Sequence, residues 1–365
     1  MKILVIQDHL RSGGTERQSI LLARAFRDAG HHVRLLTFRP GGTLEPTLGD
    51  VPHICLQPFD TTLDWFAPEL SRAVARFAPD VVLCMGRMAN CYAGRIQRQN
   101  PEAVVVATMR TGKRLPWLFR RSLQAVTHLV ANSADAKATL VRDHRVPADR
   151  ISVIYNGLVF PEAATLPAGE RETVRARHGA TNTTSVLLSV AMFRPEKGQA
   201  DLLTTAARLP KTFDWQLWLA GDGPALAHCR QLATTLGLND RVRFLGWHAN
   251  PAPLYAAADI AVHASSSEAL SNFLIEAQAH GLPAVAYDAQ GIGECFLPND
   301  TGHVIVRGDT AAFIDAVSRL ASRTPEERDA QSERARRFAR ERFDPAYQAR
   351  SYITLFSRLT KGLAP

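Results

Sequence analysis

The chain has 365 residues, of which 46% are hydrophobic and 21% are charged. This is a globular composition with length enough for two domains, and it excludes collagen-like, low-complexity and wholly disordered chains. No apolar run reaches the length of a bilayer span, and the apolar start of the chain is too short for a signal peptide. Five scattered cysteines without a C-x-x-C pair disfavour a zinc site or a disulfide framework. We therefore expect a cytoplasmic protein.

The formal net charge of +8 is confined to the first part of the chain. Residues 1–150 contain 21 Lys and Arg against 13 Asp and Glu, whereas residues 151–365 contain 22 of each kind. An excess of this kind indicates an anionic partner for the first part. A nucleic acid, an anionic membrane surface and a phosphorylated acceptor all meet that description.

The first 160 residues show a pattern of strands alternating with helices. Residues 2–7 form an apolar run with almost no alternation, as expected for a strand that is buried on both faces. A helix is predicted over 16–29, with Gly30 as the glycine that ends it. Further strands are expected at 33–38, 81–85, 104–108 and 128–131. Such alternation predicts a parallel sheet with right-handed crossovers.

The same pattern begins again near residue 184. Strands are expected at 185–193, 215–220, 242–245, 260–264 and 284–287. Residues 161–183 have Gly and Pro and little periodicity, so we interpret them as a linker. The chain is therefore predicted to be an α/β protein with two doubly wound, Rossmann-like domains, 1–160 and 184–342, facing across a cleft. A last helix within 343–365 is expected to return to the N-terminal domain.

Glu268 and Glu276 flank a predicted helix N-terminus. Glu268 falls in the loop after the strand at 260–264, and Glu276 falls one or two turns into the next helix. The free N–H groups between them suit an anion such as a diphosphate, and a carboxylate on each side could accept hydrogen bonds from sugar hydroxyls. Taken alone, two such acids are more simply a loop acid and a surface-helix acid.

Arg194 and Lys197 make the ligand-binding interpretation of these two acids stronger. They follow the strand that begins at residue 185, and Gly198 opens the next helix. Two cations at the carboxyl end of a strand, next to a helix N-terminus, are what phosphate binding requires. The alternative is a solvated turn in which Glu196 pairs with one of these cations.

Gly13 and Gly14 lie in a loop between the first strand and its helix. The loop departs from the G-x-G-x-x-G pattern, and Phe38-Arg39-Pro40 stands where a dinucleotide-binding domain has an acid. Dinucleotide binding is therefore disfavoured.

In their order and spacing, these motifs resemble the family 4 retaining glycosyltransferases of the GT-B fold, which include sucrose synthase-like enzymes and mannosyltransferases. The resemblance covers nearly the whole chain. The motifs that carry it are Gly13-Gly14-Thr15-Glu16, Asn156-Gly157, Pro195-Glu196-Lys197-Gly198, Ala220-Gly221-Asp222-Gly223-Pro224, Arg241-Val242-Arg243-Phe244-Leu245-Gly246, Glu268-x7-Glu276, Gly281-Leu282-Pro283-Ala284-Val285, Gly293-Glu294 and Thr301-Gly302.

The resemblance implies transfer of a sugar, with retention of configuration, from a UDP- or GDP-linked donor to a hydroxyl. It implies that Lys197 and a nearby arginine bind the donor diphosphate. Many members have that arginine five residues before the lysine, where this chain has Met192, so Arg194 is taken as the substitute. Glu276 would bind the ribose, and Glu268 would contact the sugar near its anomeric carbon. The residues expected to act in catalysis are Glu268, Lys197 and Arg194.

The resemblance also implies further contacts on both sides of the reaction. Backbone amides would hold the phosphates, the backbone of the strand at 242–245 would meet the base, and a glycine would let the N-terminal loop approach closely. These additional donor contacts are Leu270, Ser271, Asn272, Phe273, Arg243, Phe244 and Gly14. On the acceptor side we expect Gly13, Lys113 and Arg110, the last at a place where many members have histidine.

A diphosphate leaving group needs positive charge nearby as the anomeric bond breaks. The chain has no Asp-x-Asp and no His, Asp or Glu cluster with metal-ligand spacing, so we predict neither a divalent metal nor another cofactor. A front-face mechanism, in which the leaving phosphate oxygen takes the acceptor proton, is the family expectation.

Residues 110–121 mix five cations with Trp117, Phe119 and two leucines. Such a mixture is typical of a segment that lies on an anionic membrane, and each cation would contribute ~1 kcal/mol there. The alternative is an amphipathic helix packed on its own domain. Lipid-linked saccharides are common acceptors in the family, so we expect a lipid-linked saccharide or a surface-polysaccharide precursor, such as one of lipopolysaccharide, and peripheral association with the inner face of the cytoplasmic membrane.

Three other functions remain open from the sequence. Nucleic-acid binding has only net charge in its favour, since no recognised binding motif is present, and we predict no nucleic-acid partner. A sugar-nucleotide epimerase or a phosphorylase would share the fold. A catalytically silent relative would bind no nucleotide.

Overall fold

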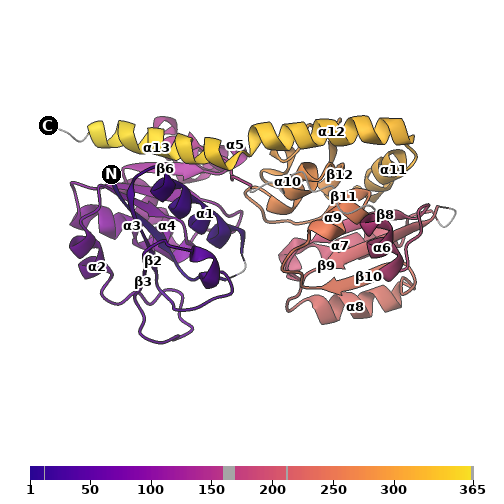
Figure 1. The fold of residues 1–365 in the computed structure, drawn as a ribbon, viewed down its shortest axis with the longest axis horizontal. Helices are drawn as coiled ribbons and strands as arrows, with labels where there is room; N and C mark the ends of the chain where they lie inside the picture. Colours follow the sequence, from indigo (N-terminus) through magenta and orange to yellow (C-terminus); the bar gives the residue numbers. More distant parts are fainter. Residues whose placement is uncertain (12, 159–168, 211–212, 363–365) are drawn as a thin grey trace. The chain divides into compact units, whose positions relative to one another are not determined.

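The computed structural model describes residues 1–365 apart from 12, 159–168, 211–212 and 363–365. The chain divides into two compact units, each built around its own parallel sheet (Figure 1). The N-terminal unit comprises Met1–Gly157 together with Phe343–Pro365, and the C-terminal unit comprises Leu158–Arg342. Two doubly wound sheets of this kind confirm the α/β fold class expected from the sequence.

Seven parallel strands form the sheet of the N-terminal unit, in the order β3-β2-β1-β4-β5-β6-β7. Their bounds are β1 Lys2–Gln7, β2 His32–Thr37, β3 His53–Cys55, β4 Val81–Cys84, β5 Val104–Met109, β6 His128–Ala131 and β7 Ile151–Val153. The central strands β4 and β5 are buried along their whole length, which explains their continuous apolar sequence. Strand order reverses on either side of β1, and such a switch point places ligands at the carboxyl ends of the strands.

Helices cover both faces of this sheet. They are α1 Gly14–Asp28, η1 Glu45–Leu48, α2 Leu70–Phe77, α3 Arg87–Gln99, α4 Trp117–Ala125, α5 Ala134–His144, η2 Ala148–Arg150 and α13 Pro345–Lys361. Helix α13 packs on α1, where the Phe26 ring lies 6.1 Å from that of Tyr352 and 5.6 Å from that of Phe356. All three side chains are fully buried, and each contributes ~2–3 kcal/mol through burial alone. The two ends of the chain therefore share one hydrophobic core.

Six parallel strands form the sheet of the C-terminal unit, in the order β10-β9-β8-β11-β12-β13. Their bounds are β8 Ser185–Val190, β9 Trp215–Ala220, β10 Val242–Gly246, β11 Ile260–His263, β12 Ala284–Tyr287 and β13 Gly302–Ile305. Here the order reverses between β8 and β11, where Leu187 pairs with Ile260. The loops that follow these two neighbouring strands carry Lys197 and Glu268.

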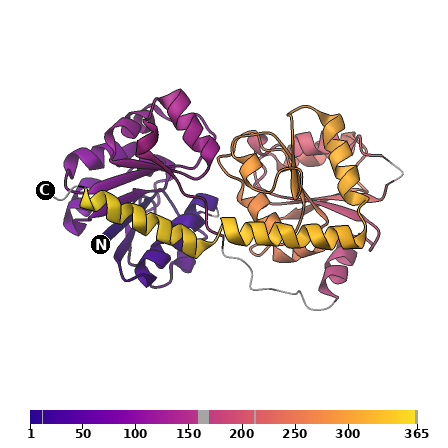
Figure 2. The same cartoon turned by 90° about the horizontal axis from the view of Figure 1, so that it is seen from above.

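The helices of the C-terminal unit pack on this sheet around a core that includes Trp215, Phe193 and Phe313. They are α6 Glu170–Arg177, η3 Pro195–Lys197, α7 Gln199–Ala206, α8 Leu226–Thr235, α9 Ala252–Ala257, α10 Asn272–Ala279, η4 Ile292–Glu294, α11 Thr310–Ala321 and α12 Pro325–Arg342. Figure 2 shows α12 and α13 as separate helices. Asp344 caps α13 by accepting a hydrogen bond from the Ala346 N–H (2.7 Å), and Pro345 occupies its first turn, so the helical stretch must break before it.

The segment interpreted from the sequence as a linker, 161–183, contains helix α6. Residues 161–168 lie outside the described part of the chain. Within α6, Arg175 is only 1% exposed, and its guanidinium lies 3.0 Å from the carboxylate of Asp259 and 2.7 Å from the carbonyl of Ala257. A buried arginine that is matched in this way packs the polar helix onto the C-terminal unit, although the helix has little apolar periodicity.

Candidate active site

The loop after β8 is shaped by Gly198. This residue has φ +70, and a Cβ built on it would lie 2.1 Å from the carbonyl oxygen of Ala264, the residue that directly follows β11. Only glycine permits both the conformation and this close approach. The two loops are joined further by a hydrogen bond from the Ser266 N–H to the Glu196 carbonyl (2.9 Å). Lys197 is thereby held against the loop that carries Glu268.

Lys197 and Glu268 form an ion pair in which the ammonium Nζ lies 2.6 Å from Oε1. The Glu268 side chain is 11% exposed and the Lys197 side chain 26%, so the ammonium retains access to solvent. Burial alone would raise the pKa of Glu268, but the His263 imidazole and the Lys197 ammonium outweigh it and lower that pKa to about 2. Glu268 is therefore a carboxylate at neutral pH, available as a hydrogen-bond acceptor.

Helix α10 begins directly after this loop. Ser271 is its N-cap, and its hydroxyl accepts a hydrogen bond from the Leu274 N–H (3.4 Å). The N–H groups of Asn272 and Phe273 belong to the first turn, where a helix offers no acceptor of its own. Leu270 and Phe273 direct their side chains into the core, with 6% and 7% exposure. What this stretch presents to a ligand is its backbone, at the positive end of the helix dipole.

Glu276 lies in the second turn of α10 and accepts a hydrogen bond from the Tyr255 hydroxyl at 2.6 Å. Tyr255 comes from α9, is 2% exposed and stacks on the His280 ring at 4.9 Å. The carboxylate is thus oriented by a buried tyrosine from another helix. Tyr255 was not predicted from the sequence, since a tyrosine 21 residues away carries no local signal.

The other donor-side candidates lie in the loop after β8 and within strand β10. Arg194 caps η3, three residues before Lys197 on the same loop, and is half-buried. Arg243 and Phe244 lie on the edge strand β10, where Arg243 Nε donates to the His178 carbonyl (3.0 Å) and Phe244 packs on Phe193. Both side chains make contacts within the C-terminal unit. A ligand at these two residues would therefore contact their backbone.

On the acceptor side, the structure places Gly13 as the N-cap of α1 and Gly14 as its first residue. Lys113 is exposed in the loop that precedes α4. Arg110 follows β5 and donates to the Asn156 side chain. Burial lowers the pKa of Arg110, an effect that the neighbouring Tyr352 opposes. Arg110 thus belongs to a polar cluster with Asn156 and with Tyr352 of α13.

Asp8 is a further candidate for a functional residue, and it was not predicted from the sequence. It follows β1, and its two carboxylate oxygens accept hydrogen bonds from the Met88 (2.9 Å) and Ala89 (2.7 Å) N–H groups of α3. Burial raises the pKa of Asp8 to about 7, against the effect of these two amides. A carboxyl that titrates near neutrality therefore lies at the carboxyl edge of the N-terminal sheet.

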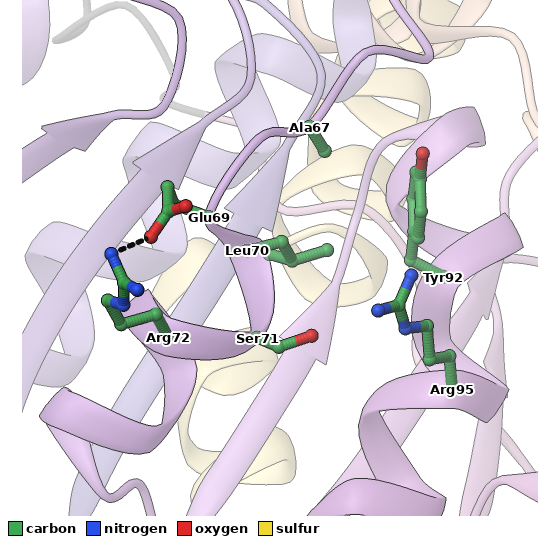
Figure 3. Close-up of a pocket in the computed structure, with 7 residues that line it drawn as sticks. All are labelled: Ala67, Glu69, Leu70, Ser71, Arg72, Tyr92 and Arg95. Atoms are coloured by element: carbon green, nitrogen blue, oxygen red, sulfur yellow. Dashed lines mark ion pairs between the residues drawn. The ribbon is translucent and has the colours of Figure 1, made fainter.

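A surface pocket lies elsewhere on the N-terminal unit (Figure 3). Glu69 and Arg72, joined by an ion pair at 2.5 Å, line one side, and Tyr92 and Arg95 of α3 line the other. None of the residues expected from the sequence to act at the site lines this pocket. We assign it no role.

Two family models match the chain. The family described as Glycosyltransferase Family 4 matches residues 12–159, and the family described as Glycosyl transferases group 1 matches residues 170–338. Together they span most of both units. The chain therefore belongs to the family 4 glycosyltransferases of the GT-B fold.

Individual relatives agree with this assignment. The lipopolysaccharide core biosynthesis glycosyltransferase LpsD of Rhizobium meliloti is 29% identical over 355 residues, which cover 95% of each chain. LpsE of the same organism, of the same description, is 35% identical over 137 residues, but this match spans only 38% of the chain and 39% of LpsE. The crystal structure of Anabaena HepE in complex with UDP has the same fold, with a TM-score of 0.82 at 22% identity over 98% of this chain and 100% of HepE.

None of the helices in the described part of the chain combines the length and the apolarity that a bilayer span requires.

Proposed function

We propose that this glycosyltransferase transfers a sugar from a UDP- or GDP-linked donor to a hydroxyl acceptor, with retention of configuration. The observation that carries the proposal is the Lys197–Glu268 pair at the carboxyl edge of the C-terminal sheet, directly before the N-terminus of α10. It combines a partly exposed cation, an ionised carboxylate and first-turn amides. That combination suits a sugar diphosphate, with the phosphates on the cation and amides and the sugar hydroxyls on the carboxylate.

The donor is held along the switch-point edge of the C-terminal unit. Lys197 and Arg194 bind the diphosphate together with the backbone N–H groups of Leu270, Ser271, Asn272 and Phe273. Each charge-assisted hydrogen bond contributes ~1.5–3 kcal/mol. Glu276, held by Tyr255, accepts hydrogen bonds from the ribose, and the backbone of Arg243 and Phe244 meets the base. Gly14 is a further donor contact in this proposal.

In the chemical step, the bond between the anomeric carbon and the diphosphate oxygen breaks and the acceptor oxygen bonds to the same carbon. The acceptor proton passes to the leaving diphosphate oxygen. Lys197, Arg194 and the α10 dipole stabilise the charge that develops on the leaving group, and Glu268 orients the sugar. No divalent metal takes part.

The acceptor is a lipid-linked saccharide or another surface-polysaccharide precursor. The support for it is LpsD, which aligns over 95% of its length and is described as a lipopolysaccharide core biosynthesis enzyme. Gly13, Arg110 and Lys113 contribute to this side of the reaction. An anionic saccharide or lipid phosphate agrees with the positive charge of residues 1–150.

The N-terminal unit meets the inner face of the cytoplasmic membrane through α4 and the loop before it. Leu115 and Phe119 point into the core, with 4% and 1% exposure, whereas Trp117 and Leu118 are 61% and 49% exposed. The exposed cations nearby are Lys113, Arg114, Arg120 and Arg121. An aromatic and an aliphatic side chain among cations are suited to an anionic interface, so this surface fits a peripheral contact.

A thermal-shift screen across UDP- and GDP-sugars tests the donor assignment. A donor at 100 times its Kd adds about 2.7 kcal/mol to the free energy of unfolding, which raises Tm measurably. The donor that does so is then incubated with and without lipid-linked saccharide acceptors. Transfer that needs the acceptor, with the anomeric configuration kept in the NMR spectrum of the product, supports the proposal. A sugar altered without an acceptor would indicate an epimerase, and no shift with any donor would refute donor binding.

A further inference from the structure

The Lys197 ammonium has two competing anions in the proposed function. In this structure it lies 2.6 Å from Glu268 Oε1, and the proposed donor brings a diphosphate to the same ammonium. Glu268 is 11% exposed, so water alone cannot fully solvate its charge once the ammonium turns away. Leaving a buried carboxylate without a partner is costly, and the cost would appear as weaker diphosphate binding.

A second partner for Glu268 lies behind it. His263, the last residue of β11, is 2% exposed, and its Nε2 lies 3.3 Å from Glu268 Oε1, the oxygen that holds Lys197. The distance allows a hydrogen bond, yet the atoms are not aligned for one, and Nε2 has no hydrogen-bond partner among the described residues. The imidazole is confined by the Phe273 ring, whose centroid lies 5.7 Å away. His263 therefore already acts on the Glu268 carboxylate through its charge distribution, and a small reorientation would align its Nε2–H with that carboxylate.

We propose that His263 is a positioning residue that holds Glu268 when Lys197 turns from the carboxylate to the donor diphosphate. The inference rests on the proposed function, since it needs a diphosphate at Lys197. The Nε2–H tautomer of a neutral imidazole is sufficient, because one N–H donor replaces one ammonium contact and no proton is transferred. Glu268 then stays ionised and aimed at the sugar while Lys197 serves the phosphates.

The role predicts a dependence on the terminal phosphate. A nucleoside diphosphate competes with Glu268 for Lys197, whereas a nucleoside monophosphate lacks the phosphate that would do so. Loss of the His263 donor should therefore weaken the diphosphate and spare the monophosphate. A merely structural histidine would affect both equally.

Calorimetry with UDP and UMP, or with GDP and GMP if the wild type prefers guanine, tests this on the full chain. His263→Leu removes the donor, and we expect diphosphate affinity to fall about 10-fold while monophosphate affinity stays within about 2-fold. His263→Gln places an amide nitrogen near the position of Nε2 and should recover most of the loss. His263→Asn, whose amide is too short to reach, should behave as the leucine variant and replaces it if the latter does not fold.

A double-mutant cycle with Glu268→Gln completes the test, because a neutral amide no longer needs either partner. In that background we expect His263→Leu to change diphosphate affinity by less than about 2-fold. Provided that the wild type binds the diphosphate, three outcomes would overturn the inference. These are equal losses of affinity for diphosphate and monophosphate, no loss of affinity at all, and a His263→Gln variant that binds as weakly as His263→Leu. A wild type that binds neither UDP nor GDP would instead overturn the proposed function, and this inference with it.

Discussion

Tyr255 donates its hydroxyl hydrogen to Glu276 Oε2 at 2.6 Å, from a helix that precedes the glutamate by 21 residues. The bond fixes the direction in which the carboxylate points. Tyr255→Phe keeps the ring that stacks on His280 and removes only this donor. We expect nucleotide affinity to fall about 3- to 10-fold, the effect of losing one hydrogen bond to a charged group, as measured by calorimetry. Tyr347→Phe, at an exposed tyrosine of α13, is the matched control and should leave nucleotide affinity unchanged. If the two variants had the same nucleotide affinity, a role for Glu276 in nucleotide binding would be contradicted.

Removal of the Lys197 ammonium should affect turnover far more than stability. Lys197→Ala deletes a partly exposed cation, so the fold should persist, while kcat falls by at least ~10²-fold because charge on the leaving diphosphate loses its main partner. Glu276→Ala should lower kcat/KM comparably through loss of donor positioning. Lys361→Ala, at the exposed end of α13, is the control. Sugar transfer at the wild-type rate by a folded Lys197→Ala protein would reject the site.

The reaction should proceed without a divalent metal, because Lys197, Arg194 and the α10 amides supply the positive charge. Protein treated with EDTA and transferred into chelated buffer should retain its rate of sugar transfer within about 2-fold. Activity that disappears with EDTA and returns with Mg²⁺ would show that a cation shares the diphosphate.

Asp8 should make stability depend on pH. Since burial raises the pKa of Asp8 from 3.8 to about 7, the folded state keeps a proton that the unfolded chain releases in this interval. The contribution of Asp8 to the free energy of unfolding is therefore largest below about pH 4 and falls, by about 4 kcal/mol, as the pH rises to about 7. Asp8→Asn should abolish this part of the pH dependence in urea unfolding between pH 5 and pH 8. The control is Asp28→Asn, at the exposed end of α1; a slope identical in wild type and Asp8→Asn would contradict the prediction.

Membrane contact should depend on Trp117 and Leu118. Replacing both by serine removes the exposed apolar pair without touching Leu115 or Phe119 in the core, so the protein should fold normally. We expect binding to vesicles with anionic lipid to fall about 10-fold in flotation at low salt. Trp247→Ser, at a 57% exposed tryptophan of the C-terminal unit, is the matched control. Wild-type protein that fails to float with anionic vesicles would exclude the contact altogether.

Much of the fold could be predicted from the sequence because central parallel strands are buried on both faces. Strands β1, β4, β5 and β9 are largely apolar for that reason. The strands that were not predicted, β3, β7 and β13, all lie at sheet edges, where three or four residues suffice and one face is partly exposed. Their sequences therefore lack the pattern that marks a strand.

The candidate site was predictable only where loops follow neighbouring strands. Lys197 and Glu268 were expected at the same edge, and the structure brings them into contact; their roles remain predictions. Tyr255 and Asp8 were missed because their hydrogen-bond partners lie 21 and at least 80 residues away in the sequence. His263 was missed because a histidine that ends a buried strand carries no signal of its role. The closeness of the two loops depends on Gly198, and nothing in the sequence around this glycine shows that the carbonyl of Ala264 fills the space of its missing side chain.

The packing of α13 on α1 has a consequence for chimeras. Because Tyr352 and Phe356 complete the core around Phe26, a hybrid enzyme that exchanges N-terminal units between relatives needs more than a single crossover after Gly157. The grafted N-terminal part would lack its own α13 and would have to pack against the α13 of the other protein. Swaps that carry residues 343–361 along with 1–157 preserve the native partners and should give the better-folded hybrids.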